Sequence, residues 1–185
     1  AVKLNGHGAW HLMQPATGEA KDLLSVFLPL CRPVPDNGSP KVIGQLGQSL
    51  DGRIATVTGR SRFINGDDGI THLHRIRAVS DAVVVGAGTA TTDNPRLTVR
   101  RTSGRNPVRV VIDRHHRVPD SHHLFTDGEA PTLRLVAGTY EKAKNPSIGS
   151  GVTEIPCLGD ADAKDPVDPK FILQVLADLG LKKVF

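Results

Sequence analysis

Residues 81–100 read Asp-Ala-Val-Val-Val-Gly-Ala-Gly-Thr-Ala-Thr-Thr-Asp-Asn-Pro-Arg-Leu-Thr-Val-Arg, an apolar run followed by two turn signals. The unbroken apolar run at residues 82–85 is typical of a buried central strand in a parallel sheet. It leads directly into Gly86-Ala87-Gly88-Thr89, which predicts a tight turn where backbone can approach a bound group. Ligands of open α/β sheets bind at the carboxyl ends of strands, so we expect a ligand site beside Thr89.

The second turn signal is Asp93-Asn94-Pro95-Arg96. Pro95 fixes its own φ angle and moves Asn94 out of the right-handed helical region, so residues 97–100 leave in a defined direction. We expect this one strand end to gather a carboxylate, two hydroxyls and two guanidiniums. Taken alone, Gly-x-Gly-Thr is equally compatible with a turn that uses glycine for geometry only.

Strands and helices alternate along the rest of the chain, which predicts an α/β fold with a mostly parallel sheet covered on both faces. Further apolar runs predict strands at residues 41–47, 108–112, 133–136, 152–155 and 182–185. One helix is predicted from an N-cap at Asn65 to Val79. Another starts at Asp168-Pro169 and ends at Gly180, and residues 139–144 form a short helix at best.

A chain of 185 residues with 38% hydrophobic residues suffices for one domain. We interpret residues 1–40 as an N-terminal extension with a Pro-rich linker, in which Pro29 closes a helical turn or two, and residues 41–185 as the domain. The net charge is +4, but the arginines are scattered and only 4% of residues are aromatic, which argues against a nucleic-acid surface. No apolar run approaches the roughly 20 residues that cross a bilayer, so we expect a cytoplasmic protein without membrane contact.

Neither the cysteines nor the histidines predict a metal site. Cys31 and Cys157 are far apart in the sequence and are expected to be inert thiols. The pairs His115-His116 and His122-His123 are expected in polar loops, because adjacent residues of an extended segment point to opposite sides. An anionic small molecule therefore fits the composition better than a metal ion or a nucleic acid.

Four motifs resemble, in order, the reductase half of the bacterial riboflavin-biosynthesis deaminase-reductase, a member of the dihydrofolate-reductase-like superfamily. Besides residues 81–100, they are Ser49-Leu50-Asp51-Gly52-Arg53-Ile54-Ala55, Ser61-Arg62-Phe63-Ile64 and Asn106-Pro107-Val108-Arg109-Val110-Val111-Ile112-Asp113. The resemblance covers residues 41–185, strongly as far as Arg114 and only in pattern beyond. It implies a dihydrofolate-reductase-like fold and a homodimer.

The resembled family uses NADPH to reduce the ribosylamino group of a 5-amino-6-ribosylaminouracil phosphate, by hydride transfer to C1 of the opened sugar. Carried over residue by residue, the cofactor contacts of the family fall on Gly47, Phe63, Thr89, Asp93 and Arg114. The substrate contacts fall on Ser61, Arg77, Leu97 and Arg100. No catalytic residue is assigned, because a hydride acceptor that is already an imine needs orientation and a dry cleft rather than a nucleophile.

Three departures from the family pattern stand out. Gln45 occupies a position that is commonly lysine, and Phe63 replaces a tryptophan. The Glu-Gly-Gly-Gly loop that wraps the cofactor pyrophosphate is expected after Phe185, so we expect a domain that lacks its C-terminal part and a native polypeptide that continues. Two hypotheses stay open: an NADPH-dependent reductase of a pyrimidine or pterin-like substrate, and a non-catalytic member that uses the same sheet for binding or dimerisation.

Overall fold

A computed structural model of the chain describes residues 2–4, 10–35, 39–59, 64, 66–144, 146–162 and 165–185. The chain divides into two compact units, Ala1–Gly38 and Ser39–Phe185. The division falls close to the predicted end of the N-terminal extension.

The N-terminal unit consists of a hairpin and one helix. Strands β1 (Val2–Leu4) and β2 (Trp10–Leu12) pair in antiparallel fashion, and helix α1 spans Gly18–Cys31. The indole Nε1 of Trp10 donates a hydrogen bond to the Leu28 carbonyl oxygen at 2.8 Å. This carbonyl belongs to the last turn of α1, where carbonyl groups lack partners within the helix, so Trp10 anchors the hairpin to α1.

Helix α1 differs from the short segment expected from the sequence. Pro29 lies inside α1, so the prediction that it closes one or two helical turns is wrong. The proline removes one backbone donor close to the end of the helix, and the helix continues to Cys31 because the following residues can still donate. The Thr17 side chain accepts a hydrogen bond from the Ala20 backbone N–H and caps the first turn.

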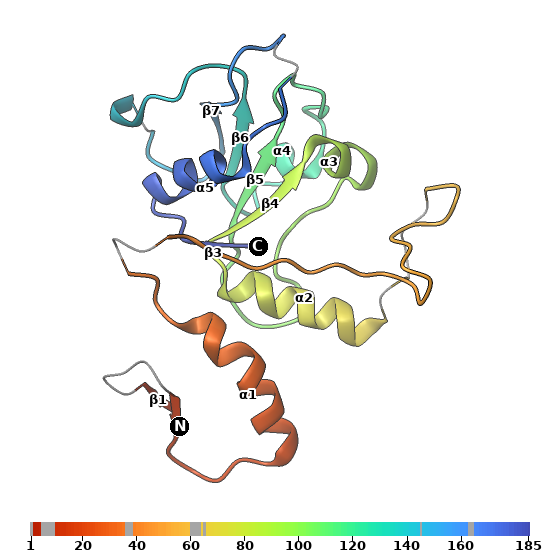
Figure 1. Ribbon diagram of the computed structural model, residues 1–185, viewed down its shortest axis with the longest axis vertical. Coiled ribbons are helices and arrows are strands. Elements are labelled where there is room, and N and C mark those ends of the chain that lie inside the picture. Colours follow the sequence, from red (N-terminus) through yellow and green to blue (C-terminus); the bar gives the residue numbers. More distant parts are fainter. Residues whose placement is uncertain are drawn as a thin grey trace. The chain divides into compact units, whose positions relative to one another are not determined.

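The second unit contains a six-stranded sheet in the order β3-β8-β4-β5-β6-β7 (Figure 1). Each pair of neighbouring strands is parallel, which confirms the predicted α/β fold with a mostly parallel sheet. The strands are β3 (Lys41–Val42), β4 (Ala82–Gly86), β5 (Val108–Ile112), β6 (Thr132–Val136), β7 (Val152–Pro156) and β8 (Lys183–Val184).

The helices of this unit are α2 (Asp67–Val79), α3 (Ala87–Asp93), α4 (His123–Thr126) and α5 (Pro169–Asp178), with a 3₁₀ turn at Lys142–Lys144. Helix α5 begins as predicted, because the Asp168 side chain accepts from the Lys170 backbone N–H and Pro169 occupies the first turn. Within the described residues, no helix has the length and apolar character needed to cross a membrane.

Both faces of the sheet are covered, as alternation along β5 shows. Val110 joins a core cluster that includes Ile172, Val175 and Leu176 of α5. The next residue, Val111, joins a second cluster on the opposite face with residues of α3 and α4. Figure 1 shows α5 on one side of β4, β5 and β6 and the pair α3 and α4 on the other.

Two predicted boundaries are wrong. Strand β3 ends at Val42 instead of residue 47, because its partner β8 is itself only Lys183–Val184 and offers few backbone groups to pair with. Helix α2 takes Gly66 as its N-cap, and the predicted cap Asn65 lies outside the described residues. Strand β8 lies between β3 and β4, so the last residues of the chain pair on both sides within the sheet.

One face of the sheet carries a buried guanidinium on β6. Arg134 donates from Nη2 to Asp113 Oδ2 at 2.7 Å and from Nη1 to Asp120 Oδ1 at 2.8 Å, and its guanidinium lies 4.8 Å from the Phe125 ring centre. The Asp113 side chain is fully buried, whereas that of Asp120 is 88% exposed. Burial would raise the pKa of Asp113, but the hydrogen bonds from Arg134 and from two backbone N–H groups outweigh it and lower that pKa.

Asp113 and Asp120, the two carboxylates that accept hydrogen bonds from Arg134, give a matched comparison. We expect Asp113→Asn to lower the free energy of unfolding by about 3 kcal/mol or more, because it leaves a buried guanidinium without its buried counter-charge. Asp120→Asn removes an exposed partner of the same guanidinium and is expected to cost less than about 1 kcal/mol. Urea unfolding at pH 7 measures both values, and equal losses would contradict this account.

Candidate functional site

The carboxyl end of β4 passes directly into a helix. Gly86 has φ −80° and serves as the N-cap of α3, which begins at Ala87, so the predicted tight turn at Gly86-Ala87-Gly88-Thr89 is wrong. Neither Gly86 nor Gly88 adopts a left-handed conformation. A Cβ atom added at either glycine would meet nothing within 4 Å. Glycine therefore leaves the surface of this junction open instead of supplying an unusual φ angle.

A cavity of about 270 Å³ lies beside α3 at this strand end. It is lined by Ala87, Gly88, Thr91, Thr92 and Arg117. The backbone of Arg117 is fixed by Asp113, because the Arg117 N–H donates to Asp113 Oδ1 at 2.8 Å. The predicted cofactor residues Thr89 and Asp93 are both exposed on α3. This end of the sheet thus offers hydroxyl groups and one guanidinium beside a backbone segment that no side chain covers at Gly86 and Gly88.

The segment after α3 changes direction at two residues in the left-handed region. Asn94 has φ 41°, which confirms that it leaves the right-handed helical region, and its Oδ1 accepts from the His123 backbone N–H at 2.9 Å. Leu97 has φ 56°, an uncommon and strained conformation for a leucine. Its side chain is 4% exposed and packs in the core, so a substrate contact at Leu97 would have to come from its backbone.

Two of the predicted substrate residues, Arg77 and Arg100, meet at Thr98. Arg77 Nη1 donates to the Thr98 carbonyl oxygen at 3.2 Å, and Arg100 Nη1 donates to Thr98 Oγ1 at 2.7 Å. Arg77 belongs to the last turn of α2, just before the amino end of β4. The predicted gathering of polar groups at one strand end is therefore only partial, because Thr89 lies on α3 at the other end of β4.

These two arginines form a cationic cluster without a carboxylate. Within residues 66–144 as described, no ion pair neutralises Arg77 or Arg100, and Arg77 Nε is buried without a hydrogen-bond partner. Burial, together with the charge of Arg100, lowers the pKa of Arg77 to about 10. Arg101 is also close in sequence, but it pairs with Asp67 at 2.8 Å. The cluster is suited to bind an anion, which would supply the missing charge and hydrogen-bond acceptors.

His74 is a member of this cluster that the sequence did not indicate. It is 3% exposed, and its Nδ1 accepts a hydrogen bond from the Arg100 backbone N–H at 3.0 Å. Burial, followed by the charges of Arg77, Arg100 and Arg101, lowers the pKa of His74 to about 4. Its spacing of three residues from Arg77, on one face of a predicted helix, is the signal that could have found it.

The structure describes only some of the remaining predicted site residues. Gly47 and Gln45 lie in an extended segment after β3, and the buried Oε1 of Gln45 has no hydrogen-bond partner among the described residues. Arg114 follows β5, and its Nη1 donates to the Asp165 carbonyl oxygen at 3.0 Å. Ser61 and Phe63 lie outside the described residues.

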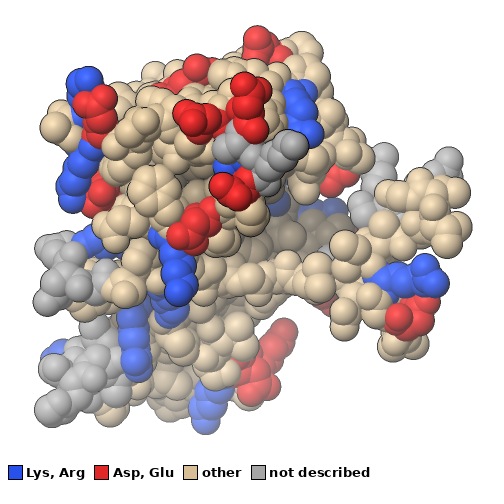
Figure 2. All heavy atoms as spheres, turned by 45° about the horizontal axis from the view of Figure 1, so that its top comes forward, with Lys and Arg blue, Asp and Glu red and all other residues tan. Residues whose placement is uncertain are grey.

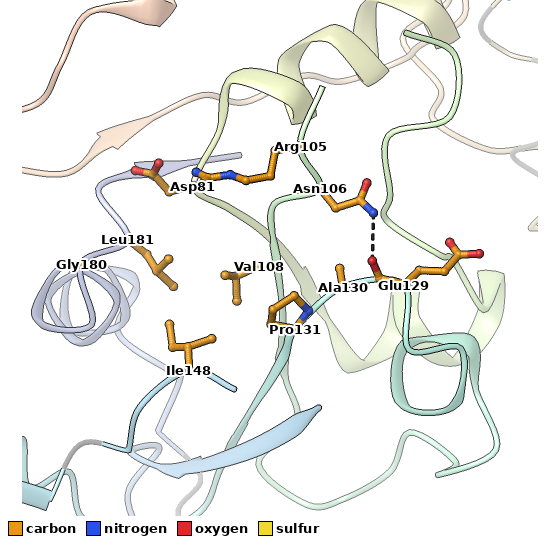
Figure 3. A pocket seen from close by; sticks show the side chains of 10 residues that line it. All are labelled: Asp81, Arg105, Asn106, Val108, Glu129, Ala130, Pro131, Ile148, Gly180 and Leu181. Atoms are coloured by element: carbon orange, nitrogen blue, oxygen red, sulfur yellow. Dashed lines mark hydrogen bonds between the residues drawn. The ribbon is translucent and has the colours of Figure 1, made fainter. Parts of the chain in front are cut away.

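A second cavity, of about 600 Å³, lies at the opposite end of the sheet, at the amino ends of β4, β5 and β6. Figure 3 shows the polar residues Asp81, Arg105 and Asn106 along the upper side of the cavity, with apolar side chains below them. Asn106 Nδ2 is engaged, because it donates to the Glu129 carbonyl oxygen at 3.0 Å. The volume of this cavity alone therefore does not make it the functional site.

The thiol of Cys157 packs in the core, and one histidine of each pair makes a local contact through its ring. Burial raises the pKa of the Cys157 thiol to about 11, so it is unreactive at neutral pH. A ring nitrogen of His116 lies 2.9 Å from Glu154 Oε1, and one of His122 lies 3.2 Å from the Thr91 carbonyl oxygen. In the described part of the chain, no group of three His, Cys, Asp or Glu residues is arranged to hold a metal ion.

The charges on the face drawn in Figure 2 are mixed. Acidic side chains gather on the upper part of this face, with basic side chains on either side of them.

Comparisons with known proteins agree on one family. The family model described as the RibD C-terminal domain matches residues 40–185. A 2,5-diamino-6-ribosylamino-4(3H)-pyrimidinone 5′-phosphate reductase of Methanothermobacter thermautotrophicus is 44% identical over 107 residues, which are 56% of this chain and 47% of the relative. The riboflavin biosynthesis protein RibD of Bacillus amyloliquefaciens is 31% identical over 169 residues, which are 90% of this chain and 43% of the relative. The chain thus spans about half the length of these relatives.

A solved structure shares the fold. The deaminase/reductase of Thermotoga maritima, described as a diaminohydroxyphosphoribosylaminopyrimidine deaminase/5-amino-6-(5-phosphoribosylamino)uracil reductase, matches with a TM-score of 0.60 and 31% identity. The match covers 79% of this chain and 38% of that one. The dihydrofolate-reductase-like fold implied by the sequence motifs is confirmed.

The low pKa of His74 predicts a specific sensitivity to acid. Unfolded histidine has a pKa near 6.5, so between about pH 6.5 and pH 4 the unfolded chain binds a proton that folded His74 does not. Stability conferred by His74 is therefore present above pH 6.5 and falls as the pH is lowered. The free energy of unfolding of the parent is expected to fall between pH 7 and pH 4.5. In His74→Asn we expect this fall to be smaller by about 2 to 3 kcal/mol. Urea unfolding of both proteins at the two pH values measures this, and identical losses would show that His74 does not titrate in this way.

Proposed function

Because the chain belongs to the RibD C-terminal domain family, we propose that it reduces a phosphorylated ribosylaminopyrimidine with NADPH. The names of its relatives support this reaction, which converts a ribosylamino group into a ribitylamino group. The observation that carries the proposal is the meeting of Arg77 and Arg100 at Thr98, with no carboxylate partner among the described residues.

The arginine cluster supports a phosphate monoester as the anion. A phosphate group offers several strong acceptors to guanidinium donors, and each charge-assisted hydrogen bond contributes about 1.5 to 3 kcal/mol where water is partly excluded. Thr98 fixes both guanidiniums before a ligand arrives, through its carbonyl oxygen and its hydroxyl. Prior ordering of these side chains lowers the entropy that binding would otherwise cost.

The strand end beside α3 supports a nucleotide cofactor. Open space at Gly86 and Gly88 allows close approach to the backbone, and Arg117 lines the adjacent cavity. The buried Oε1 of Gln45 has no donor among the described residues, which a bound molecule could supply. We assign Thr89, Asp93, Gly47 and Arg114 to this cofactor site, together with Phe63.

The residues of the chain bind and orient the reactants in this proposal. NADPH, when bound, supplies a hydride for C1 of the opened ribose. Arg77 and Arg100 hold the phosphate, and the backbone of Leu97 and the side chain of Ser61 contact the substrate. Since these groups act by orientation, the proposal requires no nucleophile or metal ion from the protein.

We further propose that the protein works as a homodimer in the cytoplasm on a small molecule, without nucleic acid or a membrane as partner. The alternative is a non-catalytic member that uses the sheet for binding or dimerisation. The cationic cluster favours the enzyme, because two guanidiniums held together without a counter-charge are a cost that a purely structural module has no reason to keep.

An assay with both nicotinamide cofactors tests the proposal directly. We expect oxidation of NADPH by the purified protein only when 5-amino-6-ribosylaminouracil 5′-phosphate is present, and a slower reaction with NADH. Nicotinamide fluorescence reports cofactor binding in the absence of substrate. Substrate binding without NADPH binding or oxidation would support the non-catalytic alternative instead.

The proposed role of Arg100 predicts that its removal weakens substrate binding and leaves cofactor binding nearly unchanged. Arg100→Ala is expected to raise KM for the phosphorylated substrate about tenfold or more, since loss of one charge-assisted contact removes about 1.4 kcal/mol or more. NADPH affinity is expected to change less than about twofold, as the cofactor site is at the other end of β4. Arg101→Ala is the matched control, because the neighbouring guanidinium is paired with Asp67. An Arg100→Ala enzyme with the parental KM would exclude Arg100 from the substrate site.

A further inference from the structure

His74 connects α2 with the segment that carries Arg100. Its Nδ1 accepts from the Arg100 backbone N–H at 3.0 Å, while Arg77, one turn further along α2, donates to the Thr98 carbonyl oxygen at 3.2 Å. Both side chains project from the same face of the helix, since residues three apart are neighbours there. The backbone between Thr98 and Arg100 is therefore held from α2 at two points.

The N–H of Arg100 depends on a side chain for its hydrogen bond. Residues 94–100 form neither a strand nor a helix, so the sheet and the helices offer no backbone acceptor of the regular kind. The preceding N–H, that of Val99, is likewise satisfied by a side chain, Asn106 Oδ1, at 2.7 Å. Removal of the acceptor at residue 74 would leave a partly buried N–H unpaired, and the chain would have to move to regain a partner.

The chemical type of this acceptor is constrained by its surroundings. The charged groups that face His74 are Arg77 on its own helix and Arg100 and Arg101 on the packed segment, with Asp67 paired to Arg101. A carboxylate at residue 74 would pair with these arginines and cancel the charge that attracts an anion. A protonated imidazole has no free acceptor at Nδ1. A neutral imidazole with its proton on Nε2 accepts the hydrogen bond and leaves both arginines uncompensated.

We infer that His74 is a positioning residue of the substrate site: as a buried neutral acceptor, it fixes the backbone of Arg100 while leaving the guanidiniums of Arg77 and Arg100 available to a phosphate group. This inference rests on the proposed function for its consequence in catalysis. It assigns to His74 no contact with the substrate or with the reacting atoms.

Three substitutions test separately the hydrogen-bond acceptor and the charge of the side chain at residue 74. His74→Asn places an amide oxygen near the position of Nδ1 and keeps a neutral acceptor, His74→Asp keeps an acceptor and adds a negative charge, and His74→Phe removes the acceptor while keeping a planar ring. We expect KM for the aminouracil phosphate within about threefold of the parent for His74→Asn, and about tenfold or more above it for the other two. We expect kcat and NADPH affinity to change less than about threefold in all three.

Ile76→Val controls for loss of stability. Ile76 is a buried residue of the same helix, 3% exposed, and the substitution weakens packing without removing a polar group. This variant is expected to keep the parental KM. If His74→Phe does not fold, the comparison of His74→Asn with His74→Asp decides the inference, because these two side chains are nearly equal in size and differ in charge.

Binding of ribose 5-phosphate, followed by NMR or calorimetry, tests the inference without catalysis. We expect the parent and His74→Asn to bind with similar affinity, and His74→Asp and His74→Phe to bind about tenfold more weakly. The same ranking in a protein that never oxidises NADPH would leave the inference standing and defeat the proposed function. Absence of binding to the parent, parental affinity in His74→Asp, or equal losses in His74→Asn and His74→Phe would overturn the inference.

Discussion

A buried guanidinium on β5 fixes the start of the segment that carries the candidate substrate site. The Arg109 side chain is only 2% exposed, so its charge must be compensated inside the protein. It donates to Asp127 Oδ1 at 2.8 Å and to the Thr132 hydroxyl, and from Nη1 it also reaches the Arg96 carbonyl oxygen at 3.3 Å. Satisfying one charge within the sheet therefore ties down the backbone immediately before Leu97 and Thr98.

From that point the segment is ordered by side chains rather than by regular secondary structure. The backbone groups of Thr98, Val99 and Arg100 are each held by a different side chain, those of Arg77, Asn106 and His74. Leu97 can stay in a left-handed conformation because its side chain is locked in the core below. An irregular segment held at so many points is rigid, which suits a site that must present charged groups in a fixed arrangement.

The sequence allowed the strands of the sheet to be predicted, because residues 82–85 are a continuous apolar run and residues 108–112 are apolar except for Arg109. It failed at Ala87, where a glycine-rich junction typical of a turn proved to be a helix start, since both patterns use the same residues. The inward arginines could not be predicted either: a single charged residue within a strand normally faces water, and Arg109 is buried only because Asp127, distant in sequence, returns to meet it. His74 was missed for the same reason, as its partner is 26 residues away.

Arg77, Arg100, Arg109 and Arg134 differ in how their charges are compensated, and this difference distinguishes a structural from a ligand-binding role. Arg109 and Arg134 each have a carboxylate partner with an exposed fraction below 10% and stabilise the fold once paired. Arg77 and Arg100 meet only oxygen atoms of Thr98 within the described chain, although burial lowers the pKa of Arg77 to about 10. Arg77 is half-buried and Arg100 is exposed. Two like charges held together oppose folding, so the protein is more stable when an anion joins them. The same like-charge repulsion that destabilises the empty cluster therefore favours the binding of an anion.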